Sequence, residues 1–299
     1  MTKKILIIGG NGFLGINSAI KLNNLGYNIT LLCKKRKKNF NFKNFKTFYC
    51  DILNFSKLKK ILSDDFDFVL NFSGNINHKN KIETKKVHYT GLKNIIKVLK
   101  NKKIKLFIQA GSGLEYGNYS SPQKEKKTCK PLSIYGKYKY LSSNYLLKKN
   151  VNFKVIILRI YQVYGPHQKF DRLIPYVISN CLKNKSFDCS DGAQFRDFLY
   201  IEDFLNLIVK IIKHRKNNSN IFNVGSGKPI RVRDVINKIN KIIKKGNPKY
   251  GSIKMRIEEI HNLYPDIKKI SKKYNWKPKF ELNLGLKKTI NYYKKFLKT

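Results

Sequence analysis

The stretch at residues 4–15, KILIIGGNGFLG, decides the fold of this chain. Its first half is apolar and predicts a buried strand, and the glycines that follow lead into an apolar helix expected over 13–25. Glycines at this spacing allow a sharp turn, let a pyrophosphate approach the backbone and start a helix close to the sheet. Unpaired N–H groups at the start of such a helix attract anions. The turn therefore predicts a dinucleotide site formed by Gly9, Gly12, Phe13, Leu14 and Gly15.

Strands and helices alternate through the first half of the chain. Strands are predicted at 4–8, 28–33, 46–50, 67–71, 105–110 and 154–159, with further helices near 56–63, 83–101 and 134–149. Such alternation is typical of a parallel, doubly wound sheet. We therefore predict an α/β fold of the Rossmann type with a smaller, interleaved C-terminal lobe.

The second half of the chain is less regular. Helices are expected near 171–183, 202–214 and 231–244, with helical pieces around Trp276 and Pro278. A strand-like segment at 221–224 is expected to return to the first sheet. We therefore expect a dinucleotide-binding domain at 1–165, to which 221–230 returns, and a substrate-binding lobe at 166–299.

The composition is that of a globular protein with a full hydrophobic core. The chain has 299 residues, 41% of them apolar. No apolar run approaches the roughly 18–20 residues that span a bilayer, and none resembles a signal peptide, so we expect a cytoplasmic protein that does not enter a membrane. The five cysteines contain no CxxC pair, which favours reduced thiols and no metal site.

The net charge is extreme, because 63 Lys and Arg oppose 18 Asp and Glu to give +45. Such a field attracts polyanions. The lysines are spread over every predicted element instead of one stripe, so a general bias towards lysine explains them better than a nucleic-acid surface. We expect a phosphate-rich partner and no specific nucleic acid. A non-catalytic Rossmann-fold protein that binds nucleic acid is a distant alternative.

Ser112, Tyr135 and Lys139 form the candidate catalytic set. Tyr135 and Lys139, four residues apart, share one helix face. A neighbouring ammonium favours the phenolate, which makes the tyrosine a general acid/base nearer neutral pH. Ser112, in the turn after a predicted strand, would hold the reacting oxygen. The same spacing recurs at Tyr89 and Lys93, so the place of Tyr135 after the nucleotide unit distinguishes it.

An ordered set of motifs over nearly the whole chain resembles the extended short-chain dehydrogenase/reductases, the NAD(P)-dependent epimerase/dehydratase family acting on nucleotide sugars. The matching segments, besides the glycine turn and the catalytic set, are GSGLEYG (111–117), LRIYQVYGPHQ (158–168), DGAQFRDFLYIEDF (191–204) and FNVGSGKPI (222–230). The resemblance implies a nucleotide-diphosphate sugar as substrate, and a homodimer formed through helices 83–101 and 134–149.

The resemblance also assigns roles to single residues. Ser112, Tyr135 and Lys139 occupy the catalytic positions of the family, and Tyr135 and Lys139 also contact the cofactor. Other expected ligands are Asp51 and Ile52 for the adenine, Arg196 for the diphosphate, and Arg256 as a second phosphate ligand.

The second strand departs from the NAD-specific pattern of the family. Cys33 stands where those members carry an acid that bonds the ribose hydroxyls, and a basic run containing Lys34 and Arg36 follows it. An absent carboxylate beside a basic cluster suits a 2′-phosphate. We therefore expect NADP as the cofactor, with NAD possible.

Two further positions depart from the family pattern. Gln162 replaces a usual Asn, and its longer amide can still bond the substrate or brace the turn. His88 also replaces a usual Asn, and we interpret it as structural.

The turn after Ser112 narrows the reaction. The 4,6-dehydratases of the family carry Asp-Glu directly after the catalytic hydroxyl, and epimerase-reductases of the GDP-fucose synthase type carry Cys two places on; here Gly113 and Leu114 occupy these places. Glu115 is interpreted as a helix-start carboxylate. Two reactions that transfer a hydride at C4 remain. One is a 4-keto reduction, which the expectation of NADP slightly favours. The other is an NAD-dependent 4-epimerisation of a UDP-hexose.

Overall fold

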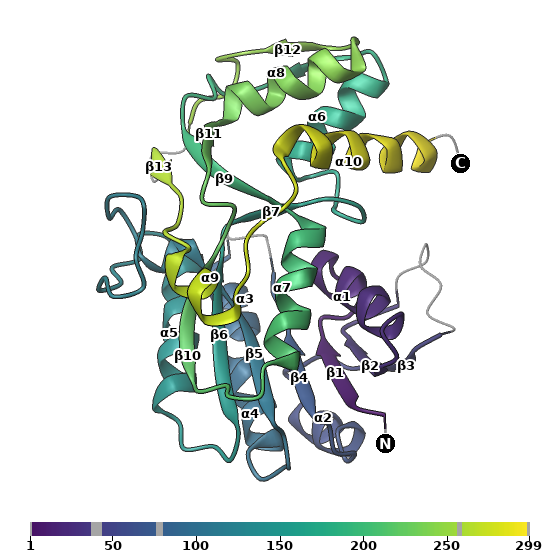
Figure 1. Ribbon diagram of the computed structural model, residues 1–299, viewed down its shortest axis with the longest axis vertical. Helices are drawn as coiled ribbons and strands as arrows, with labels where there is room; N and C mark the ends of the chain where they lie inside the picture. The colour runs from purple at the N-terminus through teal and green to yellow at the C-terminus, as the bar shows by residue number, and fades with distance from the viewer. Residues whose placement is uncertain (1, 37–43, 76–79, 256–258, 298–299) are drawn as a thin grey trace. The chain divides into compact units, whose positions relative to one another are not determined.

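The chain divides into two compact units in the computed structural model, which describes residues 2–36, 44–75, 80–255 and 259–297 (Figure 1). Unit 1 comprises Met1–Asn118, Glu125–Ile160 and Leu207–Phe222. Unit 2 comprises Tyr119–Lys124, Tyr161–Asn206 and Asn223–Thr299. Both units are therefore assembled from segments that alternate along the sequence.

Unit 1 is built on a seven-stranded sheet. Its strands are β1 (Lys4–Ile8), β2 (Asn28–Cys33), β3 (Lys46–Tyr49), β4 (Phe68–Asn71), β5 (Leu106–Ser112), β6 (Lys154–Ile160) and β10 (Asn220–Val224). The order is β10-β6-β5-β4-β1-β2-β3, and every pairing from β6 to β3 is parallel. The chain changes direction across the sheet at β1, between β2 and β4, and ligands bind at such switch points in open α/β sheets. The predicted Rossmann-type fold is confirmed.

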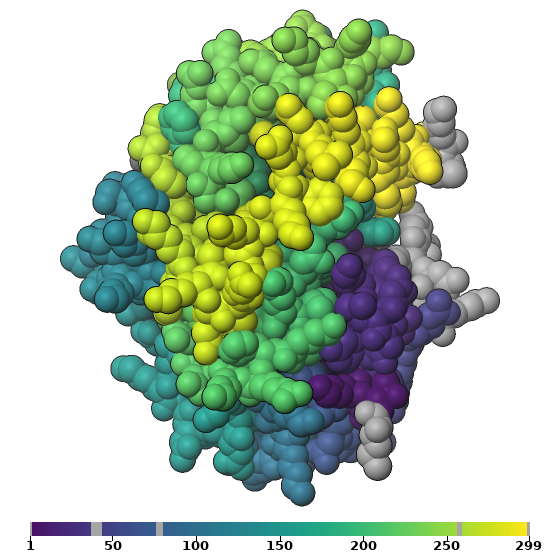
Figure 2. All heavy atoms as spheres, viewed as in Figure 1, coloured from purple at the N-terminus to yellow at the C-terminus, as the bar shows by residue number. Residues whose placement is uncertain are grey.

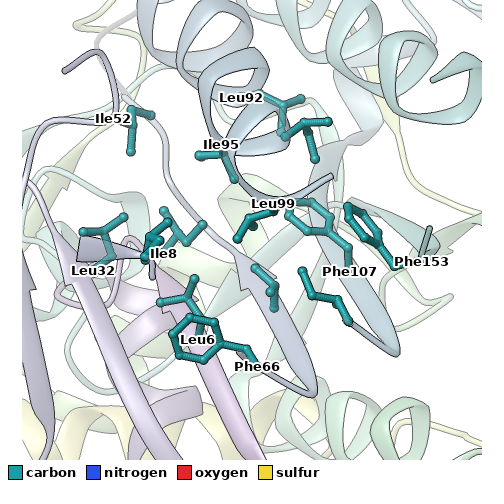
Figure 3. Close-up of a cluster of buried hydrophobic side chains, with 14 of the residues drawn as sticks. Leu6, Ile8, Leu32, Ile52, Phe66, Leu92, Ile95, Leu99, Phe107 and Phe153 are labelled. Carbon is teal, nitrogen blue, oxygen red and sulfur yellow. The ribbon is translucent and has the colours of Figure 1, made fainter. Parts of the chain in front are cut away.

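Helices cover both faces of this sheet (Figure 1). They are α1 (Phe13–Asn23), α2 (Phe55–Ile61), α3 (Lys81–Lys85), α4 (Gly91–Leu99), α5 (Ile134–Lys148) and, from Leu207 on, α7 (Ile201–Lys213). On the face covered by α2, α4 and α5, strand residues such as Leu6 and Phe107 meet Ile95 and Leu99 of α4 (Figure 3). This apolar layer fixes the helices against the strands whose carboxyl ends carry the candidate site.

The single helix predicted over 83–101 is composite. A π-helical turn, η1 (Lys86–Thr90), separates α3 from α4. Single π-turns inside helices are uncommon and often lie at functional sites. Here the turn contains His88, which is buried.

Unit 2 contains a mixed sheet that the sequence analysis missed. Its strands are β7 (Gln162–Tyr164), β9 (Phe195–Tyr200), β11 (Pro229–Arg231) and β13 (Asn262–Leu263), and a separate pair is formed by β8 (Ser186–Asp188) and β12 (Asn247–Lys249). The helices are α6 (Leu173–Leu182), α8 (Val232–Ile243), α9 (Lys268–Tyr274) and α10 (Leu282–Phe296). Side chains of α10, yellow in Figure 2, lie against the green side chains of α8.

Two buried carboxylates organise loops of unit 2. Asp203 accepts the N–H groups of Lys279 and Phe280, each at 2.9 Å. Asp197, which is fully buried, accepts the N–H groups of Ser226 at 2.5 Å and Gly227 at 2.6 Å. Burial raises the pKa of Asp197 to about 6, although these N–H groups favour its ionised form. Each carboxylate thus holds a loop by satisfying two backbone donors.

The described part of the chain carries two further features that bear on its chemistry. No helix in it combines the length and the apolar character needed to cross a membrane. The five cysteines are all buried with free thiols.

Candidate functional site

The glycine turn leaves no room for side chains. Gly9 has φ of +79°, and a Cβ there would lie 2.8 Å from the backbone of Phe72 and Ser73, directly after β4. A Cβ at Gly15 would lie 2.3 Å from the Gly9 oxygen. Gly12 is the N-cap of α1 and offers no side chain to bond the first N–H groups of the helix. This backbone cradle fits the pyrophosphate of a dinucleotide.

The residues expected around the adenosine have protein partners. Cys33 is buried at the end of β2, where desolvation raises the pKa of its thiol to about 11 despite backbone hydrogen bonds from Asn11 and Gly10. The ammonium of Lys34 lies 2.9 Å from the Asp51 carboxylate. The expected 2′-phosphate ligand is therefore already paired with a carboxylate.

The other two expected residues of this region lie in different surroundings. Ile52 belongs to the hydrophobic core, where it packs against Gly91 at the start of α4 (Figure 3). Arg36 is exposed to solvent, while Lys37 and Lys38 lie outside the described residues.

Helix α5 brings Tyr135 and Lys139 together on one face. The Lys139 ammonium lies 5.6 Å from the centre of the Tyr135 ring and donates to the Ala110 carbonyl at 2.7 Å. Lys139 is only 5% exposed, and burial lowers its pKa to about 8 although the charge of Glu115 acts in the opposite direction. A cation beside a phenol stabilises the phenolate, which is the form that accepts a proton.

Ser112 is held in place at the end of β5. Its N–H donates to Glu115 Oε1 at 2.9 Å, and its Oγ accepts the Leu114 N–H at 3.2 Å. These two bonds form a capping box around the short 3-10 helix η2 (Gly113–Glu115). Lys139 donates to the carbonyl of Ala110, which lies two residues before Ser112. A direct hydrogen bond therefore links α5 to the end of β5.

Glu115 is a helix-start carboxylate, as predicted, and has partners that the sequence did not reveal. It is fully buried, and its Oε2 accepts from Ser143 Oγ at 2.9 Å and from Arg159 Nε at 3.0 Å. The one available signal was Arg159 itself, a charged residue inside the apolar strand β6.

His88 lies against the candidate catalytic tyrosine. Its ring meets the Tyr135 ring edge to face, with centroids 5.0 Å apart. Its Nε2 lies 3.0 Å from the Asn75 carbonyl oxygen, after β4, and a Cβ at Gly74 would lie 3.0 Å from its ring. His88 thus packs between Tyr135 and the carboxyl end of β4.

Unit 2 carries the residues expected to bind the substrate. The guanidinium of Arg196 is buried on β9, pairs with Glu259, and donates to the carbonyls of Phe195 at 2.7 Å and His261 at 3.2 Å. Gln162 is exposed on β7. The expected second phosphate ligand, Arg256, lies outside the described residues.

Known proteins resemble the chain along nearly its whole length. The model of the NAD dependent epimerase/dehydratase family matches residues 5–225. A putative UDP-glucose 4-epimerase of Methanocaldococcus jannaschii is 31% identical over 306 residues, covering 97% of this chain and 98% of that protein.

Solved structures agree with this result. UDP-glucuronic acid 4-epimerase from Bacillus cereus, in complex with UDP-glucuronic acid and NAD, aligns with a TM-score of 0.88 at 27% identity, covering 98% of this chain and 99% of that one. UDP-glucose 4-epimerase from Thermotoga maritima, with UDP-glucose, has a TM-score of 0.91 at 24% identity and the same coverage, a likeness of fold alone.

Gly15→Ala should weaken NADH binding about tenfold or more. The added Cβ must displace the backbone of the glycine turn, and such overpacking costs about 1–3 kcal/mol, where about 1.4 kcal/mol is tenfold in affinity. Fluorescence titration of NADH measures the effect. Gly26→Ala is the matched control, because Gly26 has φ of +82° but nothing within 4 Å of a Cβ. Equal affinities for the two variants would contradict the expected cradle.

Lys139→Met should stabilise the fold near pH 7, and the gain should shrink as the pH rises. The folded-state pKa of about 8 lies below the unfolded value of about 10.4, so between these values the unfolded chain binds more protons and the natural protein gains stability with pH. Below pH 8 the full penalty, roughly 1–3 kcal/mol, is present. Urea unfolding across this pH range measures it. The same substitution at the exposed neighbour Lys137 is the matched control.

Proposed function

The chain belongs to the NAD-dependent epimerase/dehydratase family, as its motifs predicted, and is an enzyme of this nucleotide-sugar family; from this premise we propose that it interconverts the C4 epimers of a UDP-hexose. The observation that carries the proposal is the buried Lys139 ammonium beside Tyr135, on the sheet edge that carries the glycine cradle. Relatives named as UDP-sugar 4-epimerases favour epimerisation over the 4-keto reduction that the sequence slightly favoured.

Three residues of unit 1 are proposed to have separate roles in the reaction. Tyr135, as the phenolate that the charge of Lys139 stabilises, takes the proton of the C4 hydroxyl and becomes the phenol. Ser112 donates a hydrogen bond to the C4 oxygen, which stabilises the charge that develops there. When bound, the dinucleotide supplies the acceptor and donor of the C4 hydride. Tyr135 then returns its proton to the C4 oxygen of the inverted sugar.

Arg196 of unit 2 is proposed to bind the substrate diphosphate, with Gln162 assisting. A buried guanidinium presents a rigid fork that matches phosphate oxygens. In the described structure this fork is engaged by Glu259, so binding requires the diphosphate to replace a carboxylate on Arg196. One anion would thus exchange for another, and the guanidinium would stay paired throughout.

We propose NAD, not NADP, as the cofactor, which reverses the preference drawn from the basic run after Cys33. That preference required a cation for the 2′-phosphate, but Lys34 already pairs with Asp51. A phosphate at this place would meet the Asp51 carboxylate. The family description and the Bacillus cereus complex both name NAD.

The function is tested by incubating the protein and NAD with UDP-glucose, UDP-glucuronic acid and UDP-N-acetylglucosamine, without NADPH, and resolving the epimers. One of these sugars should be converted to its C4 epimer without net cofactor consumption. Net NADPH oxidation with a 4-keto sugar, and no epimer, would instead establish the reductase.

Tyr135→Phe should lower kcat by about 10²–10⁴-fold, because general acid/base catalysis supplies about that factor. UDP affinity should be retained, since the lost hydroxyl acts at the sugar. Tyr140→Phe, on the same helix, is the matched control and should stay near the natural kcat. Equal activity of the two variants would refute the role of Tyr135.

NADH should bind at least about tenfold more tightly than NADPH at moderate salt, where non-specific attraction by the +45 charge is screened. Asp51→Asn should narrow this ratio, because it releases Lys34 for a 2′-phosphate. Fluorescence titration of both cofactors gives the ratio. Tighter NADPH binding to the natural protein would restore the NADP assignment.

A further inference from the structure

Glu115 and Arg159 form a buried ion pair that the reaction itself does not use. Glu115 is fully buried, the Arg159 side chain is 4% exposed, and Nε and Oε2 are 3.0 Å apart. Buried ion pairs contribute little net stability, and apolar side chains of similar size often serve a fold better. Stabilisation of the fold is therefore a weak explanation for the burial of Glu115 and Arg159 as an ion pair.

We propose, on the basis of the function above, that Glu115 is a positioning residue, which joins the Ser112 turn to α5 and holds the Lys139 ammonium in its charged form, with Arg159 setting the strength of this effect.

The mechanical part of the proposal follows from the hydrogen bonds of Glu115. One carboxylate oxygen accepts the N–H of Ser112, and the other accepts the hydroxyl of Ser143 on α5. Ser143 follows Lys139 by four residues, so the two side chains share one helix face. The carboxylate thus fixes both the turn that carries Ser112 and the rotation of the helix that carries Tyr135 and Lys139.

The electrostatic part follows from the surroundings of Lys139. On its own helix it faces Tyr135, from β5 it meets the Ala110 carbonyl, and from η2 it feels the charge of Glu115. Burial favours the neutral amine, and Glu115 is the opposing charge. Arg159 lies on β6 as the ion-pair partner of Glu115, and its charge has the sign opposite to that of the carboxylate.

Other groups on neighbouring elements lie beside Arg159 and Tyr135. Arg159 also lies over the Tyr116 ring, 4.4 Å from its centre, and beside the Cys129 thiol, whose pKa burial raises to about 11. His88 faces Tyr135. Near neutral pH the thiol is therefore uncharged, and Glu115 is the charge that opposes the effect of burial on Lys139.

The two members of the pair consequently predict opposite effects. Removing the negative charge by Glu115→Gln should lower the pKa of Lys139, and removing the positive charge by Arg159→Met should raise it. Loss of packing or local unfolding would instead change both variants in the same direction. Opposite signs therefore separate positioning by charge from a structural role.

The kinetic test is the pH profile of kcat/KM, whose alkaline limb reports the loss of the Lys139 proton. We expect this limb to move about one pH unit down in Glu115→Gln and to move up in Arg159→Met. The double variant, which leaves no buried charge unpaired, should fall between Glu115→Gln and the natural protein; it provides the test if a single variant fails to fold. Asp203→Asn is the matched control, because it removes a buried carboxylate of unit 2 that holds backbone N–H groups. It should leave the limb unmoved.

A second measurement is independent of turnover. The difference in unfolding free energy between each protein and its own Lys139→Met counterpart should begin to change near pH 8 in the natural background, at lower pH with Glu115→Gln, and at higher pH with Arg159→Met. Shifts of the same sign, or no shifts, would overturn the proposal. If no nucleotide sugar is converted at all, the proposed function fails, and this measurement still decides the role of Glu115.

Discussion

The buried ammonium of Lys139 is the constraint on which the candidate site depends. A lysine that is 5% exposed has lost nearly all of its hydration, so the surrounding atoms must replace it or the amine becomes neutral. The Ala110 carbonyl supplies one hydrogen bond, and the charge of Glu115 supplies the long-range part. The sheet edge, the Ser112 turn and α5 are arranged around this single cation. The phenol of Tyr135 lies beside this cation, which favours its ionised form.

Unit 2 uses the same physical device for a different purpose. Asp197 and Asp203 are buried carboxylates whose partners are backbone N–H groups of loops, so they fix chain path instead of tuning a reacting group. In a chain with only 18 acidic residues, such placements show how much of the internal architecture rests on carboxylates. The abundant lysines contribute mainly to the outer surface and to the field around the molecule.

Regular, local signals were enough to predict unit 1. The glycine turn, the strands from β1 to β6 and the helices around them appear within a few residues of the predicted bounds, because apolar periodicity and turn residues act over short distances. In unit 2, β9 is buried along nearly its whole length and shows no alternation, and β8, β11, β12 and β13 have two or three residues each. Patterns so short or so uniform carry no period, which is why the mixed sheet was missed.

The same limit applies to the site. Motif order identified Ser112, Tyr135 and Lys139 as candidates, and the structure places them on β5 and α5 as adjoining elements. The sequence motifs could not predict that Glu115 meets Arg159, 44 residues away, or that Arg196 meets Glu259, 63 residues away. Such pairings arise only when distant strands and loops come together. Nor could they predict that Lys34 pairs with Asp51, a contact that supports the proposal of NAD over the expected NADP.

The π-turn at His88 has a consequence for how this helix tolerates change in length. A π-turn holds one residue more than the α-helical turn it replaces. Deleting one residue there would restore an ordinary helical turn and leave the facing of α3 and α4 nearly unchanged, because the wider turn accommodates the extra residue locally. The π-turn also contains His88, whose imidazole meets the ring of the candidate base Tyr135. Loss of the extra residue is therefore expected to disturb the place of this ring and not the facing of the flanking helices.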